Sequence, residues 1–335
     1  MERLFKQCVG IDISKSTFTA CVSKYYISDL QDLSEVVSFD NTKTGFNQFV
    51  KWSRKHLSKE IPVVYLMEAT GVYYEPLAYH LHRLDLFVAV ILPNKSKYYA
   101  KSLNIKTKTD AMDAKVLSTM GCLQNLRRWT PPAPIYRELR ALTRFNAELK
   151  KNRTALLNHM EALGCSENPV SSVVSSYKKI IKNIDGAIAK NMLEIEKLIK
   201  SDEQLYAKIK RLETIKSVGF ITIVTIIAET QGFELITSRK QLASYAGLDV
   251  IEKQSGSSIN GRTRISKKGN VRIRAALYFP AMGATRHNKP LKEDYNRITA
   301  KHPNIKMIGI TALQRKLLLL IYTLWKNGQV YRENE

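Results

Sequence analysis

The amino-acid sequence predicts an α/β domain at the N-terminus and a mainly helical domain at the C-terminus, joined by a helical coiled-coil linker. Three observations lead to this prediction. Strand-like and helix-like segments alternate over residues 7–125, three prolines fall within residues 131–134, and apolar residues recur every seven positions beyond that break. The predicted boundaries are 1–127 for the α/β domain, 128–212 for the linker and 213–335 for the C-terminal domain.

The N-terminal domain is expected to contain a mixed sheet. Strands are predicted over 7–13, 17–25, 35–39, 62–67 and 86–92, and helices over 41–57, 74–84 and 110–123. The order β-β-β-α-β-α-β-α is that of a ribonuclease H-like domain, with three antiparallel strands followed by parallel ones. In that arrangement the first and fourth strands are adjacent, and the last helix packs across them.

The linker carries two heptad segments joined by a short polar loop. Leucines recur at positions 142, 149, 156 and 163, and isoleucines at 181, 188 and 195. This spacing predicts an antiparallel helical hairpin, which we expect to act as a dimerising arm. Two ordinary amphipathic helices packed on neighbouring domains would show the same spacing.

Composition restricts the class of protein. Apolar residues make up 44% of the chain, which excludes a disordered protein, and the formal net charge of +23 favours a polyanionic partner such as nucleic acid. A basic surface protein without catalytic activity would have the same charge. The 4 cysteines and 6 histidines are scattered without zinc-ligand spacing. No signal peptide and no uninterrupted apolar run of about 18 residues is present, so we expect a cytoplasmic protein outside the membrane.

Four carboxylates stand out by their placement. Asp12 lies in the apolar first strand, Glu68 ends the strand over 62–67, and Asp110 and Asp113 share one face at the start of the helix over 110–123. In the predicted sheet all four could meet at one edge. Clustered carboxylates select a hard cation, Mg²⁺ or Mn²⁺, and two such ions would support phosphoryl transfer. Taken singly, Asp110 could be a helix N-cap, Asp113 a favourable first-turn charge, and Glu68 a surface strand end.

A serine-rich segment and a basic stretch follow in the C-terminal domain. Residues 255–261 predict a flexible polar loop, and no acidic residue occurs between Ser255 and Lys289. The basic residues of this stretch predict a phosphate-binding surface, with Ser266 or Gly269 preceding a helix. They include Arg262, Arg264, Lys267, Lys268, Arg272 and Arg274. A serine in such a cationic setting could attack a phosphodiester. From the residues alone, a DNA-contacting loop whose serines only hydrogen-bond phosphates is favoured.

Six short motifs of the sequence resemble those of a known protein family. The segments 10–15 (GIDISK), 67–71 (MEATG) and 108–114 (KTDAMDA), followed by 245–248 (YAGL), 255–258 (SGSS) and 266–270 (SKKGN), cover nearly the whole chain in order. They resemble the motifs of DEDD-type insertion-sequence transposases of the IS110 family, which also includes Piv-type site-specific DNA invertases. Transposition and programmed inversion use the same residues, so both activities remain open.

The resemblance implies a RuvC-like N-terminal domain, a coiled-coil linker and a C-terminal transposase domain. Asp12, Glu68, Asp110 and Asp113 match the metal ligands, and Ser255 matches the nucleophile that forms a transient phosphoserine with the cut strand. It also implies donor and target DNA as substrates, a bridge RNA as guide, and tetramers in which one subunit's acidic site meets another's serine. Two alternatives remain: a metal-dependent nuclease similar to a Holliday-junction resolvase, and a nucleic-acid-binding scaffold without catalytic activity.

Overall fold

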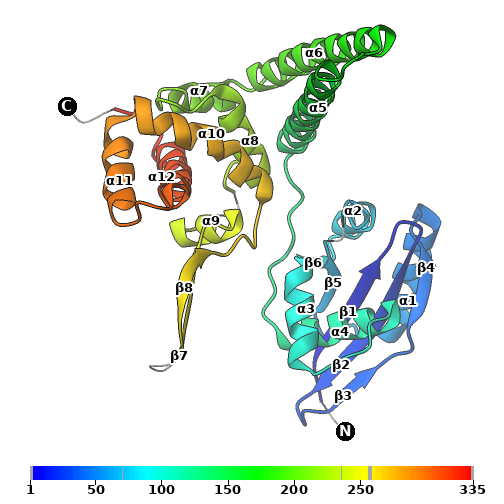
Figure 1. Ribbon diagram of the computed structural model, residues 1–335. Coiled ribbons are helices and arrows are strands. Elements are labelled where there is room, and N and C mark those ends of the chain that lie inside the picture. Colours follow the sequence, from blue (N-terminus) through cyan, green and yellow to red (C-terminus); the bar gives the residue numbers. More distant parts are fainter. Residues whose placement is uncertain (1–2, 70, 235, 256–258, 333–335) are drawn as a thin grey trace. The chain divides into compact units, whose positions relative to one another are not determined.

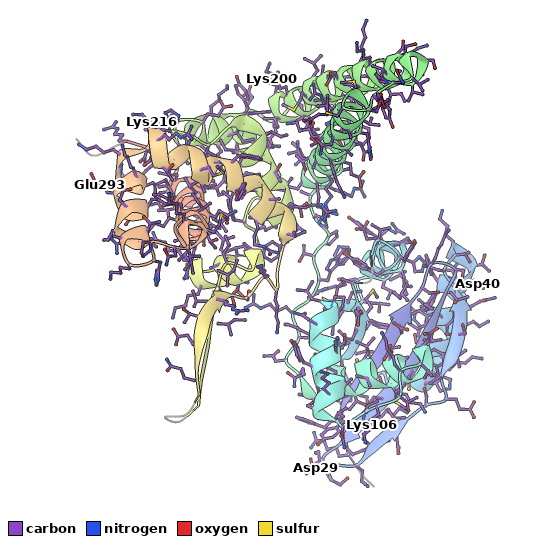
Figure 2. All side chains as sticks on the ribbon, in the orientation of Figure 1. Asp29, Asp40, Lys106, Lys200, Lys216 and Glu293 are labelled. Atoms are coloured by element: carbon purple, nitrogen blue, oxygen red, sulfur yellow. The ribbon has the colours of Figure 1, made fainter. Side chains whose placement is uncertain are left out.

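The chain folds into two compact units, Met1–Pro131 and Pro132–Glu335. The computed structural model describes residues 3–69, 71–234, 236–255 and 259–332 (Figure 1). Charged residues such as Asp29 and Lys106 on the first unit, and Lys200 and Lys216 on the second, are exposed at the surface of each unit (Figure 2).

The first unit combines a mixed sheet with helices. Its elements are β1 (Leu4–Ile13), β2 (Thr17–Tyr26), β3 (Gln31–Leu33), β4 (Val37–Asp40), α1 (Lys43–His56), β5 (Val63–Glu68), α2 (Glu75–Arg83), β6 (Phe87–Ile91), α3 (Pro93–Ser102) and α4 (Asp110–Leu123). The strand order is β3-β2-β1-β5-β6, with β4 also paired to β2. The pairs β1–β2, β2–β3 and β2–β4 are antiparallel, whereas β1–β5 and β5–β6 are parallel. The predicted first and fourth strands are therefore adjacent.

Successive side chains of β1 and β5 point to opposite faces of the sheet, and each face packs in its own apolar cluster. On one face, Val9 and Met67 pack in a cluster with Phe49 of α1. On the opposite face, Cys8 and Leu66 pack in a cluster with residues of α4. A Cβ built on Gly10 would lie only 2.1 Å from the backbone nitrogen of Ser118, so β1 and α4 approach closely where residue 10 has no side chain.

The last residues of the first unit, after α4, pack back against the sheet. The backbone N–H of Trp129 donates to the carbonyl of Val88 at 2.7 Å, and the Trp129 ring meets Tyr79 edge to face. Arg128 forms an ion pair with Asp85. These contacts carry the first unit to Pro131, four residues beyond the predicted boundary at 127.

The second unit is mainly helical. Its elements are α5 (Pro134–Gly164), α6 (Ser171–Lys200), α7 (Glu203–Leu212), α8 (Phe220–Thr230), α9 (Arg239–Ala246), β7 (Val250–Ser255), β8 (Ile259–Ile265), α10 (Val271–His287), α11 (Lys289–Ala300) and α12 (Lys306–Asn327). The mixed α/β class with a helical C-terminal region is therefore confirmed. α5 and α6 group with the helices that follow them rather than forming a unit of their own.

Helices α5 and α6 lie side by side as an antiparallel hairpin (Figure 1). Asn191 donates to the carbonyl of Leu142 at 3.1 Å, and farther along the hairpin Arg153 forms an ion pair with Asp185 at 2.5 Å. Asn146, which interrupts the heptad pattern in the sequence, is only 1% exposed. Polar residues thus set the register of a seam whose leucines are half-buried.

Helix α12 is the one helix, within the part of the chain that the structure describes, that is long and apolar enough to cross a membrane. Its residues Leu313, Leu317 and Ile321 are fully buried in the core of the second unit, together with residues of α8 and α10. Packing inside the fold therefore accounts for these three apolar residues.

The prediction of a flexible loop over residues 255–261 is wrong for the part of it that is described. Ser255 ends β7, and residues 259–261 begin β8, with Ser255 paired to Ile259 in an antiparallel ladder. The β-branched residues Val250, Ile251 and Ile265 favour strands, while the small polar residues between them disguise the pattern in the sequence. Residues 256–258 lie outside the described residues.

Candidate active site

Asp12 and Glu68 lie at the same level on one face of the sheet. Strands β1 and β5 are parallel, and their register ends on the pair Ile11 and Met67, directly before the two acids. Neighbours in register on parallel strands point to the same side, so both carboxylates lie on the side that α4 covers. Both are half-buried.

The start of α4 brings Asp110 and Asp113 to the same place. The hydroxyl of Thr19, which pairs with Asp12 across β1 and β2, donates to the carbonyl of Asp110 at 3.1 Å. Thr109 is the N-cap of the helix, because its hydroxyl accepts from the backbone N–H of Met112 at 3.2 Å. The interpretation of Asp110 as the N-cap is therefore wrong, and its carboxylate has no capping role.

The electrostatics of Asp12 reflect this arrangement. Burial and, in decreasing order, the negative charges of Asp113, Asp110 and Glu68 together raise the pKa of Asp12 from 3.8 to about 6. Burial also raises the pKa of Asp113, which the nearby charge of Lys108 lowers and those of Glu68 and Asp110 raise. Four carboxylates thus act on one another through space, and a cation among them would relieve the repulsion.

Ser96 of α3 is a residue that the sequence analysis did not identify. Its hydroxyl donates to Oε2 of Glu68 at 2.5 Å, and the side chain is 8% exposed. Helix α3 itself was not predicted, because Ser96 is its one buried residue and no apolar periodicity marks it. A hydroxyl placed this way fixes the orientation of the carboxylate.

Oxygen donors alone make up the acidic cluster, which suits Mg²⁺ or Mn²⁺ rather than zinc. Within the described residues, no three His, Cys, Asp or Glu side chains lie close enough together to hold a metal ion as they stand. Mutual repulsion separates like charges, so the carboxylates would have to rotate toward one another around a bound cation. The donor set fits a hard cation.

Ser255 belongs to the second unit, at the end of β7. Hydrogen bonds between Asp249 and Ser266 join the two chain ends at the base of the β7–β8 hairpin. The hydroxyl of Ser266 donates to the carboxylate of Asp249, and the Ser266 N–H donates to the Asp249 carbonyl at 2.8 Å. The hairpin is thus closed at its base, with Ser255 near the opposite end (Figure 1).

The basic residues around the hairpin fall into two groups. Arg264, Lys267 and Lys268 are exposed on β8 and on the turn that follows it. The side chain of Arg262 lies outside those described. Arg274, in contrast, is half-buried and donates to the carbonyl of Ala246 at 2.7 Å, where it supports the end of α9.

Glu229 of α8 is the centre of a hydrogen-bond network beside these basic residues. The sequence did not predict this role. It is 2% exposed and accepts hydrogen bonds from Arg144 of α5 at 2.7 and 3.0 Å and from Asn270 at 2.7 Å. Arg272 lies 3.9 Å away. Burial raises the pKa of Glu229, but the hydrogen bonds and the positive charges outweigh burial and hold this pKa below its usual value.

The same network fixes the start of α10. Asn270 is the N-cap, and its side-chain oxygen accepts from the backbone N–H groups of Arg272 and Ile273 at 2.9 and 3.2 Å. The helix therefore begins at Val271, after Ser266 and Gly269 as the sequence predicts, and Asn270 is its cap.

Comparison with known proteins matches both units. A family model described as a transposase matches residues 9–163, and the model of the transposase IS116/IS110/IS902 family matches residues 209–296. The chain belongs to the IS110 family of transposases. It is accordingly an enzyme of DNA transposition or recombination.

Relatives of this IS110-family protein match it along nearly its whole length. A pilin gene-inverting protein of Moraxella bovis is 30% identical, over 97% of this chain and 98% of the relative, and that of Moraxella lacunata has the same identity and coverage. A transposase for the insertion sequence element IS1111A of Coxiella burnetii is 24% identical over 97% of this chain and 91% of the relative.

Among solved structures, a Ppx/GppA family member from Aquifex aeolicus covers 97% of this chain and 92% of its own, at 10% identity and a TM-score of 0.23. A similarity this low supports no assignment of fold or function.

Proposed function

We propose that this IS110-family protein is a recombinase that cuts and rejoins DNA with a ribonuclease H-like, RuvC-like acidic site and a serine nucleophile. Asp12, Glu68, Asp110 and Asp113 would hold Mg²⁺ or Mn²⁺, and Ser255 would form a transient phosphoserine. The observation that carries the proposal is that four carboxylates lie near one another: burial first, and then the charges of the other three, raise the pKa of Asp12 to about 6. Such accumulated negative charge is typical of a cation site.

The residues of the first unit would position the cation. Asp12 and Glu68 come from adjacent parallel strands and Asp110 and Asp113 from the helix that crosses them, so the donors approach from two directions. When bound, the ion would supply positive charge where the phosphate oxygens and the leaving oxygen become more negative. Ser96 would keep one oxygen of Glu68 fixed during this process.

The serine step conserves bond energy. As the bond from Ser255 Oγ to phosphorus forms, the bond from phosphorus to a sugar oxygen breaks; the serine proton leaves to solvent and the sugar oxygen takes one up. A free sugar hydroxyl later attacks the phosphoserine and restores the serine, so no nucleotide triphosphate is required. The exposed cations Arg264, Lys267 and Lys268 would hold neighbouring phosphates.

The complete site would need both units, because the carboxylates belong to the first and Ser255 to the second. We propose that the two halves come from different copies of the chain in a tetramer assembled on DNA. The α5–α6 hairpin would act as the dimerising arm, since its heptad leucines remain half-buried within one chain.

The partners would be donor DNA, target DNA and a guiding bridge RNA, in the cytoplasm. The net charge of +23 suits several polyanions bound together. The named relatives include both gene-inverting proteins and a transposase, so programmed inversion and transposition both remain compatible with these residues.

Ser255→Ala in the full-length protein tests this proposal against the resolvase-like alternative, in which the carboxylates activate water. We expect strand cleavage to be lost, whereas cleavage at the normal rate would support a nuclease. Asp12→Asn distinguishes the recombinase and the nuclease from a scaffold without catalytic activity. Recombination in cells should be abolished by this substitution. Unchanged recombination would contradict both enzymatic mechanisms. Ser257→Ala serves as the control for a serine in the same segment.

A further inference from the structure

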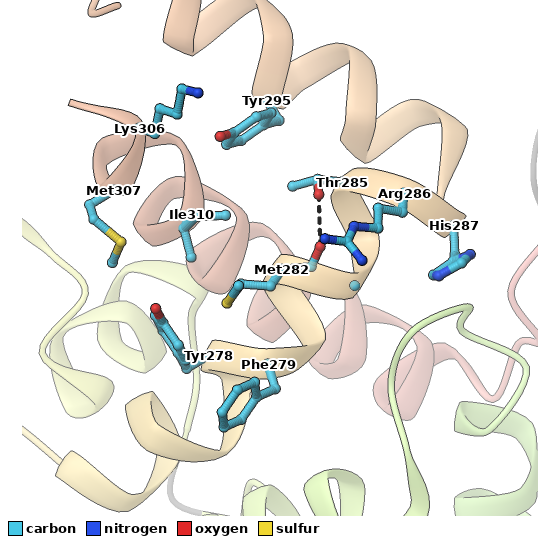
Figure 3. A pocket seen from close by; sticks show the side chains of 11 residues that line it. Tyr278, Phe279, Met282, Thr285, Arg286, His287, Tyr295, Lys306, Met307 and Ile310 are labelled. Atoms are coloured by element: carbon cyan, nitrogen blue, oxygen red, sulfur yellow. Dashed lines mark hydrogen bonds between the residues drawn. The ribbon is translucent and has the colours of Figure 1, made fainter. Parts of the chain in front are cut away.

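A pocket of about 520 Å³ lies between α10, α11 and α12 of the second unit (Figure 3). Its volume falls in the range of ligand pockets, about 300–1,000 Å³. Three aromatic rings line it, those of Tyr278 and Phe279 on α10 and Tyr295 on α11, together with Met307 on α12. None of these residues belongs to the acidic site or to the β7–β8 hairpin.

Phe279 is exposed to an extent that the fold does not explain. Its side chain is 76% exposed, the largest value among the large apolar residues described, and Met307 beside the pocket is 51% exposed. The Phe279 ring meets Tyr278 edge to face with centroids 5.3 Å apart, which leaves Phe279 open to solvent. Large apolar groups exposed together around a pocket indicate a binding site.

The charge around the pocket restricts the ligand. Arg286, His287 and Lys306 line it, and no Asp or Glu is among its described lining residues. Neither Arg286 nor Lys306 forms an ion pair with any part of the chain that the structure describes. Aromatic faces beside unpaired cations are the combination that binds single-stranded nucleic acid, because bases stack on the rings while phosphates meet the charges. An apolar protein segment would gain nothing from the cations.

The position on α10 supports the same ligand. Arg272, near the hairpin, and Phe279 lie seven residues apart on this helix, about 10 Å at 1.5 Å per residue. A strand bound along α10 could therefore reach both the basic residues near the hairpin and the pocket.

We infer that this pocket binds an unpaired nucleotide of the DNA strand being exchanged, with its base on Phe279 and its phosphates near Arg286 and Lys306. Moving a strand from one duplex to another requires bases to leave their stacked pairs, so DNA recombination supplies such nucleotides. The inference rests on the DNA recombination activity of the family and uses neither the metal site nor Ser255.

The experiment measures binding by the full-length protein of a short single-stranded DNA, the matching duplex, the RNA of the same sequence, and the same DNA strand with abasic positions. Phe279→Ala should weaken binding of the ordinary single strand about 10-fold, and Phe279→Trp should retain it. With the abasic strand the Phe279→Ala penalty should vanish. Arg286→Gln should reduce the salt slope by about 0.7. Phe5→Ala, an exposed phenylalanine of the first unit, and Lys178→Gln, an exposed charge of α6, serve as matched controls.

The inference would be overturned if Phe279→Ala bound single-stranded DNA as well as the Phe5→Ala control, or if Phe279→Ala weakened binding of the abasic strand as much as that of the ordinary strand. A clear preference for RNA over DNA would also contradict it. So would loss of self-association in Phe279→Ala with DNA binding intact. Because binding is measured directly, the outcome is independent of whether Asp12 or Ser255 is catalytic.

Discussion

The hydroxyl of Ser96 donates a 2.5 Å hydrogen bond to Oε2 of Glu68, and thereby links α3 to the end of β5. Residues that hold a metal-binding carboxylate in orientation change metal affinity when they are removed, typically 10- to 100-fold. This bond makes Ser96 a positioning residue in the proposed mechanism.

Ser96→Ala should raise the Mg²⁺ concentration needed for half-maximal strand cleavage about 10-fold, while cleavage at saturating Mg²⁺ changes little. The matched control is Ser102→Ala on the same helix, where the hydroxyl donates to the carbonyl of Tyr99 at 2.7 Å and is exposed. An equal shift in both variants would show that α3 stability, rather than the bond to Glu68, is responsible.

Gly10→Ala should lower the free energy of unfolding of the first unit by about 1–3 kcal/mol, because the new Cβ would meet the backbone of α4. Displacement of α4 should also weaken Mg²⁺ binding, since Asp110 and Asp113 begin that helix. Denaturant unfolding followed by the fluorescence of Trp52 and Trp129, with Trp325 of the second unit replaced by Phe, reports on this unit.

The control for this substitution is Gly186→Ala in α6, where a Cβ meets nothing within 4 Å. Alanine favours the helix over glycine, so Gly186→Ala should stabilise the protein by about 0.5–1 kcal/mol. Similar destabilisation by both substitutions would contradict the role assigned to the close approach of β1 and α4.

Glu229→Gln should destabilise the second unit at neutral pH, by about 1.5–3 kcal/mol for lost charged hydrogen bonds. The pKa of Glu229 is lower in the folded state than in the unfolded chain. Its contribution is therefore fully present above the unfolded value near pH 4.3 and is lost as pH falls through the folded value. Unfolding of both proteins at about pH 7 and pH 3.5 checks this, and a stability difference unchanged by pH would contradict it.

The sequence predicted the arrangement of the sheet well where patterns were long and apolar. The helix over 110–123 was placed at the bounds the structure shows, and Asp12 and Glu68 were expected on adjacent strands. Thr109 and Ser96 could not be identified from spacing, because a cap and a hydroxyl partner are decided by side-chain geometry. Glu229 was missed for the same reason, since its partners Arg144 and Asn270 lie far away in the sequence.

Assembly of the site from two copies predicts complementation. The Asp12→Asn and Ser255→Ala proteins should each fail to cut DNA, and a mixture of the two should recover cleavage, because some active sites would combine an intact acidic cluster with an intact serine. Mixing two preparations of Ser255→Ala provides the control. Failure of the first mixture, with both variants folded and binding DNA, would place the acidic cluster and the serine of each site in the same chain.

The most direct test of the account is to trap the protein on a nicked DNA substrate that cannot be rejoined and to map the attachment site by mass spectrometry. We predict a Mg²⁺-dependent covalent adduct in which the phosphate is carried by Ser255, absent from Ser255→Ala and from Asp12→Asn. Cut DNA with free ends and no adduct on the wild-type protein, or an adduct that persists in Ser255→Ala, would contradict the proposed mechanism.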